Sequence, residues 1–177
     1  MSNCCTIRSA TLADADSLSR LAAATFHLGC PAETNPAHLN AFIFAELSPD
    51  RFREFLASES VTILLAEMEG ELAGFTMLVS ASLHPQIIAE SPLEIRKFYV
   101  VPSRHGSGVA HQLMQAAEPL LEDPRYDSAW LSVYSGNSRA ISFYRKWGFE
   151  VIGTHYFNVG GDPQKDFVMQ RTPRGSK

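Results

Sequence analysis

Apolar positions in the first third of the chain follow a helical spacing after one short strand-like run. Leu12 and Leu18 fall on one face of the segment 11–26, where apolar residues recur every three or four positions. Asn35 and Ser48 each precede a proline, which is typical of a helix N-cap followed by proline at the first helical position. The elements predicted for this part are a strand at 5–8 and helices at 11–26, 36–47 and 49–57.

Beyond residue 60 the pattern becomes that of strands. Two runs of β-forming residues, 61–68 and 72–80, are joined by Glu69-Gly70-Glu71, which predicts a hairpin with glycine in its turn. A second turn is marked by Gly160-Gly161-Asp162-Pro163. The remaining predicted elements are a loop at 82–91, a strand at 93–101, a helix at 107–122, a strand at 129–134, a helix at 138–147 and a closing hairpin of strands 151–159 and 165–170.

Length and composition fit one globular domain. The 177 residues correspond to a single domain at about 150 residues per domain, and 45% of them are apolar while 19% are charged. Hairpins combined with crossover helices predict a mixed α/β (α+β) fold, and we expect one domain over 1–177 with its core at 6–171. The net charge of −4 and the lack of a basic run argue against nucleic acid and membrane surfaces as partners.

The cysteines and histidines form no disulfide or metal pattern. Cys4, Cys5 and Cys30 are odd in number and lack zinc-ligand spacing, as do the six histidines. The first residues lack the charged and apolar regions of a signal peptide. The longest uncharged stretch, 72–89, is broken by polar residues and a proline, so it cannot span a bilayer as a helix. We therefore expect a soluble, cytoplasmic protein without a bound metal.

The segment before the predicted helix at 107–122 is rich in glycine and reads Arg104-His105-Gly106-Ser107-Gly108-Val109-Ala110. Its glycines remove Cβ atoms that would hold backbone N–H groups away from a ligand. The helix that begins there directs unpaired N–H groups and its positive dipole end into the same space. This predicts a phosphate or pyrophosphate site, with a ligand-free turn as the alternative. The segment matches none of three other motifs. Val109 and Ala110 stand where a P-loop needs Lys and Ser or Thr, His111 stands where a Rossmann loop needs a third glycine, and His105 and Val109 stand where a nucleophile elbow needs glycines around its serine.

A second informative segment is Asn137-Ser138-Arg139-Ala140-Ile141-Ser142-Phe143-Tyr144-Arg145-Lys146-Trp147-Gly148-Phe149. Ala140, Phe143 and Trp147 fall on one helical face, and Gly148 stands in the usual position after a helix end. Taken alone, this segment favours a core helix with one partly buried tyrosine, Tyr144.

Together the two segments resemble the Gcn5-related N-acetyltransferase (GNAT) superfamily. The first looks like its acetyl-CoA motif Gln/Arg-x-x-Gly-x-Gly/Ala, and the second like its Asn-x-x-Ala-x-x-Phe-Tyr-x-x-x-Gly-Phe segment. His105 departs from the usual Gln or Arg, although Arg104 stands beside it. The resemblance covers nearly the whole chain. It implies a central mixed sheet of about six to seven strands, flanked by helices and splayed at the acetyl-CoA site.

The resemblance also implies which residues bind acetyl-CoA, the expected co-substrate. The pantetheine arm would pair as an added strand with the third long strand, beside the glycine segment. The binding residues implied are Phe98, Tyr99, Val100, His105, Gly106, Ser107, Gly108, Val109, Ala110, His111, Asn137 and Tyr144.

The reaction implied is attack of a primary amine on the acetyl-CoA thioester. An alkyl amine is protonated at neutral pH, so a base must remove a proton. Glu94 is our candidate base, with a solvent-facing strand carboxylate as the alternative. The Val100 N–H would stabilise the oxyanion. Tyr144, protonated at neutral pH, would give a proton to the leaving thiolate.

The acceptor is expected to be a small amine. Two segments resemble the PaiA-like branch, which is associated with polyamine acetylation: Gly153-Thr154-His155-Tyr156-Phe157, with Asp162, Gln164 and Asp166, and Ile95-Arg96-Lys97-Phe98-Tyr99-Val100. A protein N-terminus or lysine is a second possibility for the acceptor, and a non-catalytic acetyl-CoA-binding module is a third reading of the chain. The resemblance makes a homodimer an expectation. It places the acceptor near the helices 36–47 and 49–57, whose phenylalanines we expect to pack on the sheet: Phe42, Phe44, Phe52 and Phe55.

Overall fold

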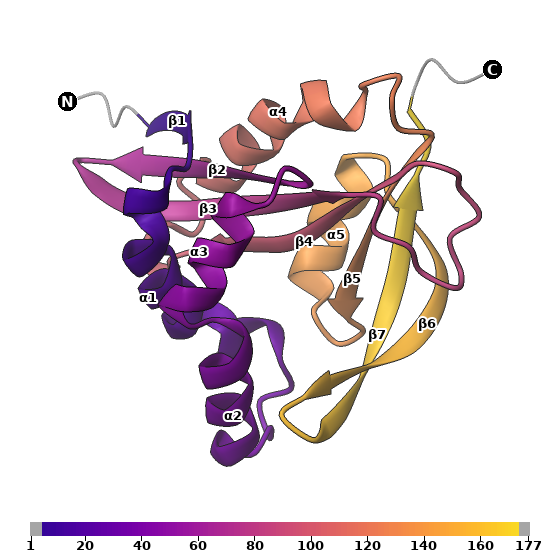
Figure 1. The fold of residues 1–177 in the computed structure, drawn as a ribbon. Coiled ribbons are helices and arrows are strands. Elements are labelled where there is room, and N and C mark those ends of the chain that lie inside the picture. The colour runs from indigo at the N-terminus through magenta and orange to yellow at the C-terminus, as the bar shows by residue number, and fades with distance from the viewer. Residues whose placement is uncertain (1–4, 174–177) are drawn as a thin grey trace.

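The computed structural model describes residues 5–173, which form one seven-stranded mixed sheet with five α-helices (Figure 1). The elements are β1 (Cys5–Ser9), α1 (Ala15–Thr25), α2 (Pro36–Glu46), α3 (Pro49–Ala57), β2 (Val61–Met68), β3 (Glu71–Ser80), β4 (Pro92–Val100), α4 (Val109–Leu121), β5 (Ser128–Tyr134), α5 (Ser138–Lys146), β6 (Glu150–Val159) and β7 (Asp162–Arg171). The predicted mixed fold with six to seven strands is confirmed. Cys4 lies outside the described residues.

The strand order across the sheet is β1-β2-β3-β4-β5-β7-β6. Neighbouring strands are antiparallel except for β4 and β5, which are parallel and pair over only three residues each, Pro92–Glu94 with Ser128–Trp130. The β3–β4 ladder contains a register shift at Arg96. Met77 pairs with Lys97 and Leu78 with Ile95, so Arg96 has no pairing partner on β3. Bulges of this kind bend a strand and re-aim its side chains.

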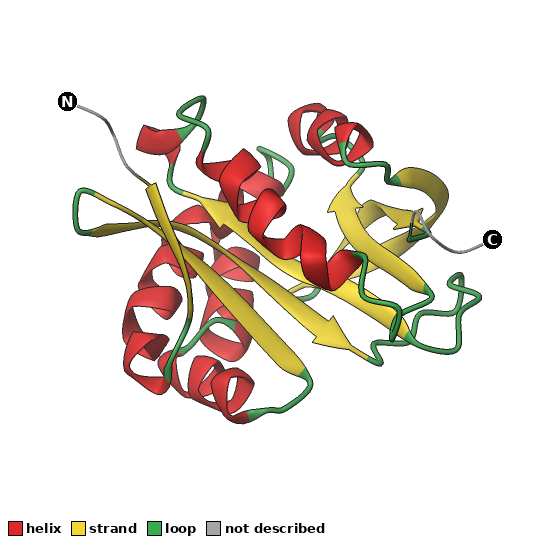
Figure 2. Cartoon of the chain, turned by 90° about the horizontal axis from the view of Figure 1, so that it is seen from above, coloured by secondary structure: helices red, strands yellow, loops and turns green. Residues whose placement is uncertain are grey.

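Helices cover both faces of the sheet (Figures 1 and 2). On one face, α1 and α3 pack on β3 through a core that contains Leu18, Phe52 and Phe75. On the other face, α4 and α5 share a core with β5 and β7, to which Met114 and Met169 belong. Together the two layers bury every position of β3 from Ala73 to Val79, because side chains that alternate between the two faces are all buried when both faces are covered.

The predicted N-caps are confirmed. The Asn35 side chain accepts the N–H of Ala37 at 2.9 Å, and the Ser48 hydroxyl accepts the N–H of Arg51 at 3.4 Å. The predicted helix 11–26 instead starts with a 3-10 turn at Leu12–Asp14, and α1 begins only at Ala15.

Two expectations about apolar faces are wrong. Leu12 is 61% exposed, because it lies in the 3-10 turn before α1 and therefore does not share the inward face of that helix. Phe44 is 84% exposed, because α2 lies at the rim of the molecule and directs Phe42 and Ile43 into the core instead. Periodicity gave the helices correctly but not how much of each face is covered.

The closing hairpin is tighter than predicted. Its turn is Gly160 and Gly161 alone, both with positive φ, and β7 begins at Asp162 rather than at 165. Pro163 is tolerated within β7 because it pairs only with Asn158 there, in a position whose missing N–H would point away from β6. The Gly160 carbonyl lies 2.6 Å from His38 Nδ1, which ties the hairpin to α2.

Candidate active site

The glycine segment forms the start of α4. Gly106 and Gly108 have φ values of +79° and +90°, a conformation that other residues rarely adopt, and for this reason the helix begins at Val109 rather than at the predicted 107. Within the described residues, the backbone N–H groups of Gly106, Gly108 and Val109 have no hydrogen-bond acceptor. Free N–H groups at a helix N-terminus form a cradle that suits phosphate.

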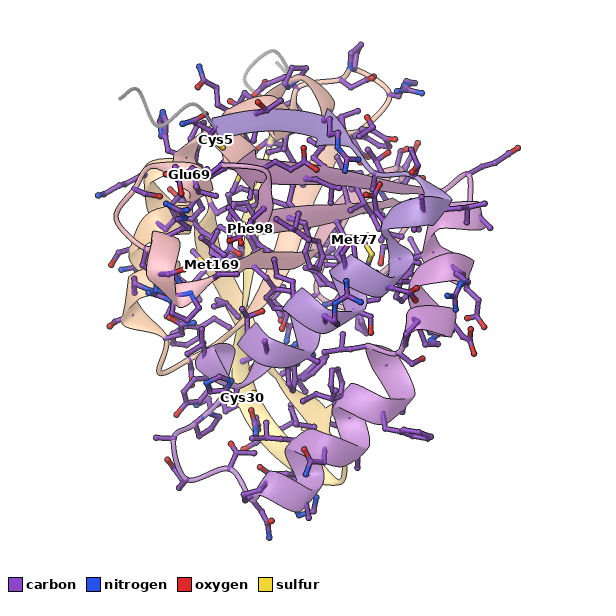
Figure 3. The ribbon with its side chains drawn as sticks, turned by 90° about the vertical axis from the view of Figure 1, so that its left-hand side faces the viewer. Cys5, Cys30, Glu69, Met77, Phe98 and Met169 are labelled. Carbon is purple, nitrogen blue, oxygen red and sulfur yellow. The ribbon has the colours of Figure 1, made fainter. Side chains whose placement is uncertain are left out.

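His105 links the cradle to the neighbouring helix. Arg139 donates to its Nδ1 at 2.7 Å, so the neutral ring carries its proton on Nε2 and donates to the Val100 carbonyl at 2.9 Å. Arg104 pairs with Glu69 at 2.6 Å, in the β2–β3 turn labelled in Figure 3. The histidine that departs from the usual motif thus holds an arginine beside the glycines. Sequence reasoning missed Arg139, which lies within the second motif.

A cavity of about 460 Å³, which we call the cradle cavity, lies beside these glycines. It is lined by nearly all of the predicted acetyl-CoA residues from β4, the glycine segment and α5. Ser107 and Val109 do not line it, because the Ser107 hydroxyl bonds to the Arg104 carbonyl and the Val109 side chain is buried in the core. The predicted residues that line it are Phe98, Tyr99, Val100, His105, Gly106, Gly108, Ala110, His111, Asn137 and Tyr144.

A second cavity of about 400 Å³, the inner cavity, adjoins the first. Phe98, Tyr99 and Tyr144 line both, so the two spaces meet at β4 and α5. Figure 3 labels Phe98 near the middle of the molecule and, below it, Cys30, which lines the inner cavity. The ionisable side chains on its walls include Glu46, Arg51, Glu94, Arg96, Lys97 and Asp166.

Tyr144 stands where the cavities meet and is 8% exposed. Its ring packs against Phe98 and Phe149, with centroids 6.2 and 6.0 Å apart. Burial raises the pKa of its phenol above the ordinary value of 10, so the group is protonated at neutral pH. Within residues 5–173 no side chain or backbone group bonds to its hydroxyl. The geometry leaves this proton available to a molecule in either cavity.

Glu94 lines the inner cavity, but its Oε2 is heavily engaged. The guanidinium of Arg96 donates to this oxygen at 2.9 and 2.7 Å, and Ser82 donates to it as well. Glu94 is 9% exposed, and Arg96 provides the counter-charge of its carboxylate. This oxygen of Glu94 is therefore already occupied by the Arg96 guanidinium and the Ser82 hydroxyl.

Lys97 is a buried cation that sequence reasoning did not single out. It is 8% exposed, forms no ion pair or hydrogen bond among the described residues, and lies 5.7 Å from the centre of the Phe55 ring. Burial, the largest cause, lowers its pKa from 10.5 to about 8. Lys97 follows the bulged residue Arg96 on β4 and lines the inner cavity.

Asp166 is a second buried carboxylate, which the sequence indicates only as part of the PaiA-like segments. It is 7% exposed and accepts a hydrogen bond from the Ser132 hydroxyl at 2.6 Å. Burial raises its pKa to about 6, and the Ser132 hydroxyl opposes that rise. The signal was present in the alternation of β7, where Gln164 and Asp166 place polar groups on the face that Val168 fills with an apolar one.

Among residues 5–173, no group of three or more His, Cys, Asp and Glu side chains is arranged to hold a metal ion. In the same part of the chain, no helix combines the length and apolar character needed to cross a membrane.

Known proteins resemble this chain in sequence and in fold. A sequence model of the acetyltransferase (GNAT) family matches residues 27–149. An uncharacterized N-acetyltransferase of Mycobacterium tuberculosis is 36% identical over 160 residues, which cover 90% of this chain and 98% of that protein. The PaiA N-acetyltransferase of Thermoplasma acidophilum, solved with coenzyme A, has a TM-score of 0.77 at 20% identity, over 96% of this chain and 99% of that one. The ribosomal-protein-S18-alanine N-acetyltransferase of Escherichia coli has a TM-score of 0.70 at 16% identity, over 98% and 97%.

The chain therefore belongs to the acetyltransferase (GNAT) family, as its two motifs predicted. It is an acetyl-CoA-dependent N-acetyltransferase of the GNAT type. The solved structures share its fold.

Proposed function

We propose that the protein transfers the acetyl group of acetyl-CoA to a primary amine of a small molecule. The observation that carries this proposal is the pair of adjoining cavities, which meet at Tyr144. One has the phosphate cradle at its end, and the other is lined by ionisable side chains. A two-substrate transfer needs such an arrangement, because both reactants must reach one point.

The cradle cavity is the proposed acetyl-CoA site. The free N–H groups of Gly106, Gly108 and Val109 would bind the pyrophosphate, and Arg139 would add a positive charge beside them. The short pairing of β4 with β5 leaves the end of β4 near Phe98 and Tyr99 without a β5 partner, which supports the expected docking of the pantetheine arm. Acetyl-CoA supplies an activated acyl group there as a thioester.

The chain's own residues would handle charge and protons. The Val100 N–H is the proposed donor to the oxyanion. Tyr144 is the proposed acid for the leaving thiolate, because its proton is retained at neutral pH and its hydroxyl is free among the described residues. A carboxylate of the inner cavity would take the proton of the acceptor ammonium, and Glu94 is the one predicted from sequence.

The inner cavity is the proposed acceptor site. Its carboxylates Glu46, Glu94 and Asp166 give an ammonium group places to bind. Polyamines are the acceptor class that the PaiA-like segments favour, and the likeness to a PaiA N-acetyltransferase structure supports testing them first.

The experiment is an acceptor panel. Thiol release from acetyl-CoA would be followed with spermidine, spermine, other small primary amines and short peptides. Saturable release with a small amine supports the proposal, and a polyamine among the best acceptors supports its finer form. Release with peptides alone would make the protein an N-terminal or lysine acetyltransferase. Binding of acetyl-CoA without transfer to any acceptor would favour a non-catalytic binding module.

A further inference from the structure

A row of hydrogen-bonded side chains leads from an exposed loop to the inner cavity. It joins His84 in the loop 82–91, His155 on β6, Ser132 on β5 and Asp166 on β7. His84 Nε2 lies 3.4 Å from His155 Nδ1, His155 Nε2 lies 2.6 Å from Ser132 Oγ, and Ser132 Oγ lies 2.6 Å from Asp166 Oδ2. The last three residues meet because the β5–β7–β6 ladders place them side by side.

The hydrogens in this row have one consistent assignment. The Gln86 backbone N–H donates to His84 Nδ1 at 3.2 Å, so a neutral His84 carries its proton on Nε2. That proton points at His155 Nδ1, and His155 in turn carries its proton on Nε2 and donates to Ser132. Ser132 donates to Asp166. Every bond therefore points toward the carboxylate, and burial lowers the pKa of both histidines, which favours their neutral forms.

The row leaves half of Asp166 available. Only Oδ2 receives a hydrogen bond, and within the described part of the chain Oδ1 has no donor. Asp166 lines the inner cavity together with Tyr144. Glu94 differs in kind, because the Arg96 guanidinium neutralises its carboxylate directly. Among residues 5–173, Asp166 thus has no cationic partner; its Oδ2 is hydrogen-bonded and its Oδ1 accepts no hydrogen bond.

We propose that Asp166 is the catalytic base that takes the proton of the acceptor ammonium, and that Ser132, His155 and His84 position its carboxylate. This inference rests on the proposed amine acetylation. The N–H bond of the ammonium breaks, its electron pair stays on nitrogen, and the proton binds Asp166 Oδ1. The amine lone pair attacks the thioester carbonyl carbon and the C–S bond breaks. Tyr144 protonates the sulfur and regains a proton from the acylated nitrogen. The proton on Asp166 leaves to solvent as the one net proton of the reaction.

The ionisable groups near Asp166 and its burial determine the pH at which its carboxylate becomes ionised. Ionisable groups surround it from the neighbouring strands, the loop and the segment after α1. His155 on β6, Tyr134 on β5, His84 in the loop, Cys30 after α1 and Asp162 on β7 lie on its own side, while Tyr144 on α5 and Glu94, Arg96 and Lys97 on β4 line the same cavity. Burial is the largest cause acting on Asp166 and raises its pKa to about 6, against the Ser132 hydrogen bond, which lowers it. The carboxylate is then ionised and ready to accept a proton above that pH.

The test is the pH profile of kcat/KM for four variants with a small-amine acceptor. Asp166→Asn should lower kcat/KM by about 100-fold or more and remove the acid limb near pH 6. Glu94→Gln should lower it less and keep the limb. Ser132→Ala should move the limb to higher pH by about one unit, because it removes a bond that favours the ionised form. Glu150→Gln, on an exposed carboxylate of β6, is the matched control and should behave as the wild type.

Acetyl-CoA titration and circular dichroism should show each variant folded and able to bind. Asp166→Asn activity within threefold of the wild type, or loss of the acid limb in Glu94→Gln alone, overturns the inference while leaving the acetylation intact. An unmoved limb in Ser132→Ala refutes the positioning role. Absence of turnover by the wild type with every amine overturns the proposed function, and with it the inference.

Discussion

Replacing Lys97 with methionine is expected to stabilise the folded protein near neutral pH. The Lys97 ammonium is buried; within residues 5–173 it forms no ion pair or hydrogen bond and lies 5.7 Å from the centre of the Phe55 ring. A tenfold change in proton affinity corresponds to about 1.4 kcal/mol. The fall in pKa from 10.5 to about 8 therefore corresponds to about 3 kcal/mol of unfavourable burial of the charged form. Loss of the cation–π contact with Phe55 destabilises the variant by about 1 kcal/mol, so the net increase in the free energy of unfolding is about 2 kcal/mol.

The pH dependence of this gain follows from the two pKa values of Lys97. Below pH 8 the side chain is charged in both the folded and unfolded states, so the folded state bears the whole cost of burial. Between pH 8 and 10.5 the folded state loses the proton first, and the cost declines. Above pH 10.5 both states are neutral and the cost is gone. Lys97→Met should thus be most stabilising at pH 7 and lose its advantage as the pH rises.

Urea unfolding of the two proteins at pH 7 and pH 10.5 measures the difference directly. The exposed Lys146→Met is the matched control and should change the free energy of unfolding by less than about 0.5 kcal/mol at both values. Equal stability of Lys97→Met and the wild type at pH 7, or a difference that does not shrink toward pH 10.5, would refute the reasoning about the buried charge.

Three further predictions concern the site and the N-terminal part. Tyr144→Phe should lower kcat by about 100-fold with the KM for acetyl-CoA within threefold; steady-state kinetics check this, and an unchanged kcat removes Tyr144 from the mechanism. Arg139→Ala should weaken acetyl-CoA binding about tenfold, as measured by titration calorimetry; an unchanged affinity would show that Arg139 does not contribute to phosphate binding. Arg8 lowers the pKa of Asp14 from 3.8 to about 2, so Arg8→Met should cost stability that the wild type holds above pH 3.8 and loses toward pH 2. Since Arg8 is 39% exposed, we expect a loss of about 1 kcal/mol in the free energy of unfolding at pH 6 and a much smaller loss at pH 2, where Asp14 is about half protonated in the folded state; equal stability at pH 6 would contradict it.

Local signals predicted most of the fold. Asn35 and Ser48 cap their helices as expected, because a cap depends on residues that are near in the sequence. The glycines at 106 and 108 likewise mark the start of α4. Leu12 and Phe44 were misplaced because periodicity gives the apolar face of a helix but not the extent to which the rest of the fold covers it.

The cradle cavity was also largely predictable, since most of its lining residues lie in three short segments, at 98–100, 104–111 and 137–144. The inner cavity was not. Asp166, Ser132 and His155 come together through the register of three strands, and Arg96 reaches Glu94 on a strand with an irregular ladder. Register is set by the whole sheet. A sequence pattern therefore gave Glu94 as the base without its counter-charge.

The measurement that tests the central claim most directly is the stoichiometry of transfer. Coenzyme A thiol release and the mass of the acceptor would be followed together in one reaction with a small primary amine. Our account predicts saturable kinetics and one N-acetylated amine for each thiol released. Thiol release without acetylated product, or acetyl-CoA binding with neither, would contradict it.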